Sequence, residues 1–255
     1  MENRRNSPSE EPLTNPSLCP QPLFQPSENP MKFSGIQKTS LIDYPKRIAS
    51  ILFTPGCNLR CPYCYNWRIV LNPKPPFLNE ETALSILESR KKYVDAVVIT
   101  GGEPTNHKEL PKFLKKLKER GFAVKLDTNG LNPSILEESM PHVDYVALDV
   151  KTSLEKYAKL GAKDTKDFLR SIEILKNSKI EYEFRTTVVP GFVDAEDIQK
   201  IGELVKGAKT FAFQQFIPGD TLDKTFNTLK PYSPEEIAGF AEIMKKYVNE
   251  IILRI

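Results

Sequence analysis

The chain has 255 residues, of which 40% are hydrophobic and 27% are charged, and its formal net charge is +3. This composition is ordinary for a soluble folded protein, and so small a charge gives no support to nucleic-acid binding. The sequence has no apolar run near the roughly 20 residues that a membrane-spanning helix needs.

The first 30 residues differ in composition from the rest. They contain seven of the 21 prolines, with Ser, Asn, Gln and Glu between them. Such a segment buries too little apolar surface to offset the entropy of ordering it, so we expect residues 1–30 to be a disordered tail. The tail has neither the apolar stretch of a secretory signal nor the composition of a transit peptide. Residues 31–255 are long enough for one domain, and a chain beginning at Met31 would lose no foldable segment.

From residue 48 onward, short apolar runs alternate with longer amphipathic segments. Strands are expected at Ile48–Phe53, Ala96–Thr100, Ala123–Leu126, Tyr145–Leu148, Tyr182–Val188 and Thr210–Phe216. Helices are expected at Glu80–Lys92, Pro111–Arg120, Pro133–Ser139, Asp167–Asn177, Ala195–Val205 and Pro234–Val248. Six strands, each followed by a helix, predict an α/β fold with a parallel sheet and right-handed crossovers. The sheet could be open and doubly wound or a partial barrel, and in both folds ligands bind at the carboxyl ends of the strands.

Three cysteines stand close together after the first predicted strand. Cys57, Cys61 and Cys64 have the spacing C-x3-C-x2-C, and the remaining cysteine is Cys19. Structural zinc usually takes four ligands, often as two separated pairs, and a cubane iron–sulfur cluster normally takes four cysteines. A loop that offers three leaves one iron open to a small molecule, although a zinc site completed by Cys19 is the alternative. With no second cysteine pair in the folded part, a disulfide framework is not expected, and a reducing cytoplasm fits.

Polar residues also mark the other predicted strands. In chain order they are Gly101-Gly102-Glu103-Pro104, Asp127-Thr128-Asn129-Gly130, Asp149 with Lys151, Arg185, and Gln214-Gln215. Because the carboxyl ends of parallel strands meet at one edge of the sheet, this convergence predicts a single site.

The charged members of this set have definite chemical uses. Glu103 could bind a ligand ammonium through charge-assisted hydrogen bonds. Asp127 and Asp149 end different strands and would repel each other unless Lys151 or a bound cation neutralised them. Arg185 is either an ion-pair partner or an anion clamp.

Together these motifs resemble a known family. The cysteine triplet, followed about 40 residues later by Gly101–Pro104, resembles the radical S-adenosylmethionine (SAM) superfamily. The closer resemblance is to activating enzymes of glycyl radical enzymes, especially the activator of anaerobic ribonucleoside-triphosphate reductase. Gly35–Pro45, Thr54–Asn58 and Leu126–Gly130 carry this closer likeness, which spans roughly residues 33–250.

The resemblance implies a (β/α)6 partial TIM barrel of the radical SAM type, with a [4Fe–4S] cluster on Cys57, Cys61 and Cys64. The fourth iron would take the amino and carboxylate groups of S-adenosylmethionine, and no catalytic residue is implied beyond the cluster and cofactor site. The resemblance places Asn66 beside the cluster loop and Gly101, Gly102 and Glu103 at the methionyl amine. It places Lys151 and Arg185 near the carboxylate or ribose. Asp127, Thr128 and Asp149 match a monovalent cation site of pyruvate formate-lyase activase.

The resemblance also implies a reaction. A reduced cluster passes one electron to the sulfonium, which releases methionine and a 5′-deoxyadenosyl radical. The radical removes hydrogen from a backbone glycine of a partner glycyl radical enzyme, here expected to be anaerobic ribonucleotide reductase. A one-electron donor such as flavodoxin or ferredoxin would reduce the cluster. The cofactors carry the chemistry, while the protein supplies orientation, electrostatics and water exclusion.

Two departures from the activase pattern leave the substrate open. Tyr65 stands where activases commonly have a histidine after the third cysteine, and the region around Gln214-Gln215 lacks the histidine of pyruvate formate-lyase activase. A radical SAM enzyme acting on a small molecule is therefore the second hypothesis, and a zinc-binding interaction module is a non-enzymatic third. Asp43 and Tyr44 either shape the substrate side or anchor the chain before the first strand.

Overall fold

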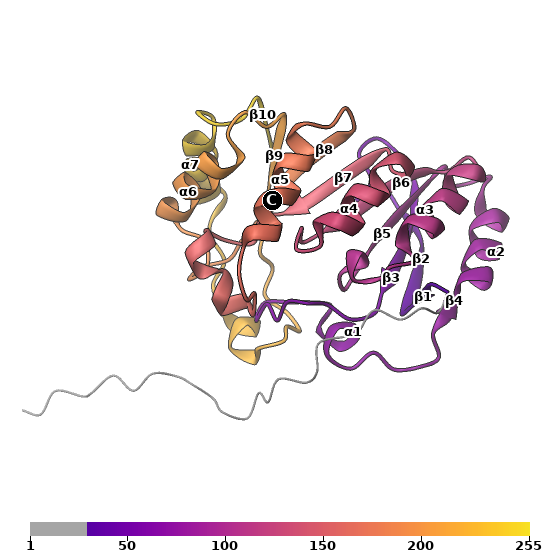
Figure 1. Cartoon of the computed structure of the whole chain (residues 1–255). Helices are drawn as coiled ribbons and strands as arrows, with labels where there is room; N and C mark the ends of the chain where they lie inside the picture. Colours follow the sequence, from indigo (N-terminus) through magenta and orange to yellow (C-terminus); the bar gives the residue numbers. More distant parts are fainter. Residues whose placement is uncertain (1–29) are drawn as a thin grey trace, which may run out of the picture.

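The structure, a computed structural model, describes residues 30–255 (Figure 1). The predicted tail lies outside the described residues except for Pro30, and so does Cys19.

One eight-stranded sheet, in the order β10-β9-β8-β7-β6-β5-β3-β2, carries the fold of the described residues. Six of its strands match the predicted ones, and these six are neighbours and parallel. They are β3 (Ala49–Thr54), β5 (Ala96–Gly101), β6 (Ala123–Thr128), β7 (Tyr145–Asp149), β8 (Glu181–Val188) and β9 (Thr210–Gln215). The sheet ends at β2 on one side and β10 on the other, so the barrel is partial, and the predicted fold class is confirmed.

The sequence did not predict the two end strands. β2 (Gly35–Ser40) runs antiparallel to β3, and β10 (Glu250–Arg254) runs parallel to β9. Both have partly exposed side chains. β2 is mostly polar, and the apolar run of β10, residues 251–253, is shorter than the roughly four to eight residues that usually mark a strand. A separate short pair joins β1 (Lys32–Phe33) to β4 (Leu78–Asn79).

The helices follow the strands largely as predicted. They are α1 (Trp67–Leu71), α2 (Glu80–Arg90), α3 (Leu110–Glu119), α4 (Pro133–Ser139), α5 (Lys166–Lys176), α6 (Ala195–Val205) and α7 (Pro234–Met244). Short 3-10 turns lie between them: η1 (Pro104–Asn106), η2 (Met140–His142), η3 (Leu154–Leu160) and η4 (Lys224–Thr228). Within residues 30–255, no helix is both long enough and apolar enough to cross a membrane.

The helix boundaries have local causes. Asn79 caps α2, because its side chain accepts a hydrogen bond from the Thr82 N–H. The prediction carried α7 on to Val248, but the helix ends at Met244. The backbone N–H groups of Asn249 and Glu250 instead donate to Ala208 and Lys209, which aligns the chain to enter β10.

The two faces of the sheet carry different kinds of side chain. One face packs with the helices into the main apolar core, which includes Val97, Leu126 and Phe113. On the inner face, a small apolar cluster of Ile51, Val98 and their neighbours gives way to buried charged side chains such as those of Lys125 and Asp127. The carboxyl ends of the strands therefore open onto a polar interior.

Candidate functional site

A pocket of about 200 Å³ lies at the carboxyl ends of the parallel strands. It is lined by all the residues that the sequence assigns to the cluster and the cofactor, namely Cys57, Cys61, Cys64, Asn66, Gly101, Gly102, Glu103, Asp127, Thr128, Asp149, Lys151 and Arg185. The structure therefore brings these residues together at one edge of the sheet, whereas Gln214 and Gln215, which the sequence also placed there, are not part of the lining.

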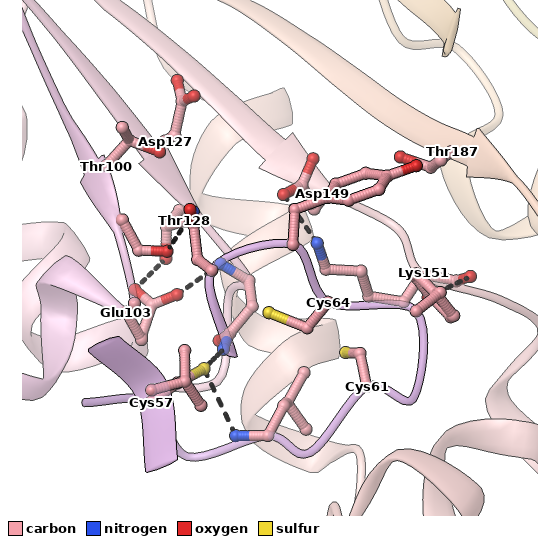
Figure 2. A pocket seen from close by; sticks show the side chains of 18 of the residues that line it. Cys57, Cys61, Cys64, Thr100, Glu103, Asp127, Thr128, Asp149, Lys151 and Thr187 are labelled. Atoms are coloured by element: carbon pink, nitrogen blue, oxygen red, sulfur yellow. Dashed lines mark hydrogen bonds and ion pairs between the residues drawn. The ribbon is translucent and has the colours of Figure 1, made fainter. Parts of the chain in front are cut away.

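The three cysteines lie on one loop and face the same space (Figure 2). This loop is fixed to two distant segments of the chain. The Arg60 N–H donates to the Leu160 carbonyl at 2.7 Å, and the Asp223 N–H donates to the Pro62 carbonyl at 2.8 Å. The loop is thus held in place by the chain, and its three sulfurs are presented together.

The cysteines are free thiols, and burial raises their pKa values, that of Cys61 to about 11. Metal ligation deprotonates such thiols. In the part of the chain that the structure describes, no three His, Cys, Asp or Glu side chains are gathered around a point where one metal ion would sit. A single zinc needs every sulfur about 2.3 Å away, whereas a cubane gives each thiolate an iron of its own. This donor set fits the cluster rather than zinc.

Gly101 and Gly102 allow two loops to touch. The Gly102 N–H donates to the Thr54 carbonyl and the Glu103 N–H to the Gly56 carbonyl, both at 2.8 Å. Gly101 has a φ of 110°, which favours glycine, and a Cβ on Gly102 would overlap the Gly56 carbonyl. The glycine pair therefore places the start of this loop directly against the segment that leads into the cysteines.

We expect Gly102→Ala to destabilise the protein by about 1–3 kcal/mol, the usual cost of overpacking. The methyl group would meet backbone atoms of residues 54 and 56, which cannot rotate away as a side chain can. Gly239→Ala is the matched control, because nothing lies within 4 Å of its added Cβ and alanine is favoured in a helix such as α7. Chemical denaturation of both variants measures the difference, and a Gly102→Ala variant as stable as wild type would contradict this packing argument.

The carboxylate of Glu103 is almost fully buried and accepts hydrogen bonds from the chain itself. Its Oε1 accepts from the N–H and hydroxyl of Thr105 and from the Thr128 hydroxyl, and its Oε2 accepts from the Asn129 N–H at 2.7 Å. Burial raises the pKa of Glu103 despite these bonds. The side chain ties the loop after β5 to the loop after β6 (Figure 2). Its predicted contact with a ligand ammonium stays a prediction, and Oε2 is the oxygen with spare acceptor capacity.

Arg185 joins Asp127, near the end of β6, to Asp149, the last residue of β7. Its Nε lies 2.6 Å from Asp149 Oδ1, and its Nη atoms lie 3.3 Å from Asp127 Oδ2. Lys151 Nζ lies 2.8 Å from Asp149 Oδ2. Burial alone would raise the pKa of both carboxyls, but the neighbouring cations hold each pKa below its ordinary value. Lys151 therefore neutralises Asp149 as one alternative predicted, and Arg185 acts as an ion-pair partner.

Sequence reasoning missed part of the lining of the pocket. Its further residues are Leu59, Tyr63, Tyr65, Val70, Thr100 and Thr187, whereas Asn129 belongs to the polar residues that the sequence placed at the strand ends. Thr187 lies two residues beyond Arg185 on β8, and alternate residues of a strand share a face, so the period of two could have found it. Tyr63 lies between the second and third cysteines and packs edge-on against Phe192 at 5.4 Å.

Four residues that the sequence singled out lie away from the lining of the pocket. Gln214 faces Thr187, and the Gln215 side chain donates to backbone carbonyls, one of them that of Tyr232. Tyr44 packs with the apolar cluster of the inner face and lies 6.0 Å from the Tyr145 ring, and Asp43 accepts a hydrogen bond from Ser40. For Asp43 and Tyr44 these contacts support the anchoring role.

Comparison with known proteins identifies the family. The profile described as the radical SAM superfamily matches residues 51–205. A protein of Methanocaldococcus jannaschii that is named as a glycyl-radical enzyme activating enzyme is 38% identical over 230 residues, which cover 87% of this chain and 95% of that protein. The pyruvate formate-lyase-activating enzyme of Clostridium pasteurianum is 30% identical over 204 residues, which cover 75% of this chain and 83% of that enzyme.

Solved structures share the fold. The crystal structure of QueE from Escherichia coli superposes with a TM-score of 0.56 at 16% identity, over 88% of this chain and 93% of that one. The sequence matches exclude the zinc-binding interaction module. This chain belongs to the radical SAM superfamily and, within it, to the glycyl-radical enzyme activating enzymes.

Proposed function

We propose that this protein removes a hydrogen atom from a backbone glycine of a partner glycyl radical enzyme, and that the partner is an anaerobic ribonucleoside-triphosphate reductase. The observation that carries the activase assignment is the 38% identity to a named activating enzyme over 95% of that enzyme's length. The choice of partner rests on the segment Gly35–Pro45, which resembles the opening segment of reductase activators.

The cofactors of this family are a [4Fe–4S] cluster and S-adenosylmethionine. Bound together, they supply a 5′-deoxyadenosyl radical when the reduced cluster cleaves the sulfonium. We assign Cys57, Cys61 and Cys64 to the cluster, since their sulfurs face one space on a loop that the chain holds in place. A flavodoxin or ferredoxin is the proposed electron donor.

The remaining residues of the pocket would bind and orient the cofactor. Asn66 donates its side-chain N–H to the Gly101 carbonyl at 2.9 Å, and this hydrogen bond ties the segment after the third cysteine to the glycine loop that is proposed to hold the methionyl amine. Lys151 and Arg185 are proposed to face the carboxylate or ribose. Both cations are already held by Asp149, so their positions are set before the cofactor arrives. Tyr63 and Leu59 are buried, and they exclude water from this end of the pocket.

The test is electron paramagnetic resonance under strict anaerobiosis. We expect reduced enzyme, S-adenosylmethionine and an anaerobic ribonucleotide reductase to give a glycine-centred doublet that needs every component. The control is the same reductase with alanine in place of its radical glycine, which should give no doublet. If no candidate partner acquires the signal while a small metabolite accelerates the formation of 5′-deoxyadenosine, the small-molecule hypothesis replaces this one.

A further inference from the structure

Lys125 is a buried cation that the reaction described above does not use. Its side chain is 2% exposed, and its Nζ lies 2.6 Å from Asp127 Oδ1. A lysine is rarely so completely buried unless it is paired, because an ammonium group loses its hydration there. Nζ also lies 5.9 Å from the centre of the Tyr145 ring, whose electron-rich face attracts a cation.

Lys125 approaches Asp127 from behind the cofactor site. It precedes Asp127 by two residues on β6, so the two side chains share the inner face of the sheet. Asp127 lines the pocket, whereas Lys125 does not. The ammonium therefore lies on the far side of the carboxylate and reaches it without entering the space of the ligand.

The cations around the two aspartates outnumber the carboxylates. Lys125, Lys151 and Arg185 contact Asp127 and Asp149 at 2.6–3.3 Å. Two further acids lie near this cluster, and each is engaged by other groups. Glu183 is held by the guanidinium of Arg254 at 2.6 and 2.7 Å and by the Tyr145 hydroxyl at 2.9 Å. Glu103 accepts hydrogen bonds from Thr105, Thr128 and Asn129.

A monovalent cation does not fit this arrangement. The resemblance assigns such an ion to Asp127, Thr128 and Asp149, but Arg185 already bridges both carboxylates. The Thr128 hydroxyl is turned to Glu103 instead. A fourth cation would meet three others within a buried cluster, where repulsion is only weakly screened.

We propose that Lys125 is the chain's own counter-ion, which takes the place of a bound sodium or potassium ion and holds Asp127 and, through Arg185, Asp149 in position for the cofactor. Lys125 is a positioning residue, and it makes the site independent of alkali cations. The positioning role of Lys125 rests on the proposed cofactor site, but the melting-temperature test needs neither cofactor nor partner. If the proposed function were wrong, the melting temperatures would still test the inference.

The test compares melting temperatures in sodium, potassium and tetramethylammonium chloride at a constant ionic strength of about 0.1 M, so that screening stays the same. Wild type should melt at the same temperature in all three salts. Lys125→Met, which keeps the length of the side chain but removes its charge, should gain about 2–4 °C in sodium or potassium as an ion enters beside Asp127. Lys125→Arg should behave as wild type, because it retains a cation.

Lys118→Met is the matched control. Lys118 pairs with Asp144 at 2.6 Å, and the Lys118 side chain is far more exposed than that of Lys125. Removing the charge of Lys118 should therefore give a melting temperature that is the same in all three salts. Formation of 5′-deoxyadenosine by the reconstituted enzyme should follow the same pattern: independent of the salt in wild type and raised by sodium or potassium in Lys125→Met.

Two results would overturn the inference. One is a saturable stabilisation of wild type by sodium or potassium, and the other is a folded Lys125→Met variant that gains nothing from either ion. If Lys125→Met does not fold, sodium-23 NMR of the wild-type protein replaces this test. Line broadening that saturates with sodium would reveal a bound ion and overturn the inference. A spectrum without such broadening would support Lys125 as the counter-ion.

Discussion

Replacing Cys61 with alanine is expected to abolish reductive cleavage of S-adenosylmethionine. Cys61 is a buried thiol that faces a common space with the partly buried Cys57 and Cys64, and a cubane held by the two remaining thiolates would lack one of its three protein ligands. Removing an outer-shell partner of a metal ligand already costs about 10–100-fold in affinity or activity, so losing a ligand itself should cost more than about 100-fold. Iron and sulfide content and the yield of 5′-deoxyadenosine under anaerobic conditions measure the effect. Cys57→Ala and Cys64→Ala should do the same.

The control for this prediction is Cys19→Ala. Cys19 lies far from the cysteine loop in sequence, and its substitution should leave iron content and cleavage unchanged. An active Cys61→Ala enzyme, or an inactive Cys19→Ala enzyme, would show that the ligands are assigned wrongly.

Asp149→Asn is expected to cost about 3–5 kcal/mol in the free energy of unfolding, the usual effect of removing one partner from a buried ion pair. Asp149 contacts Arg185 at 2.6 Å and Lys151 at 2.8 Å, and both cations would remain buried without it. The control is Asp95→Asn. Its partner Arg47 is at 2.5 Å, but both side chains are exposed, so the loss should stay below about 1 kcal/mol. Equal losses in the two variants would contradict the role of burial.

The contribution of Asp149 should also depend on pH. Its pKa in the folded protein lies below the ordinary value of 3.8, because Arg185 and Lys151 outweigh the effect of burial. A depressed pKa means that the stabilisation is complete above about pH 4 and is lost as pH falls below the pKa of the unfolded chain. Wild type and Asp149→Asn should therefore differ most near neutral pH and converge in acid. Denaturant titrations at several pH values measure this, and a difference that persists unchanged in acid would contradict the assignment.

Local sequence patterns predicted the central strands of the fold. Six mostly apolar runs separated by amphipathic segments predicted six parallel strands, because an alternation of strands and helices implies right-handed crossovers between parallel strands. The end strands β2 and β10 were not predicted, because β2 is mostly polar and the apolar run of β10 is only three residues long. Parallel topology also brought the residues after each strand to one edge, so Cys57, Glu103 and Asp149 could be assigned to one pocket without coordinates.

The sequence by itself thus determined the fold class and the family, and it named most of the residues that line the pocket. Only the tertiary structure decided which partner each polar side chain takes. Glu103 turns to Thr105, Thr128 and Asn129, and Lys125 joins Asp127 from behind the pocket. The reason is that hydrogen bonds and ion pairs act over about 3 Å, and such distances depend on how loops pack, as where Gly102 meets Gly56. Periodicity fixes the face on which a side chain lies, but packing fixes what it meets there.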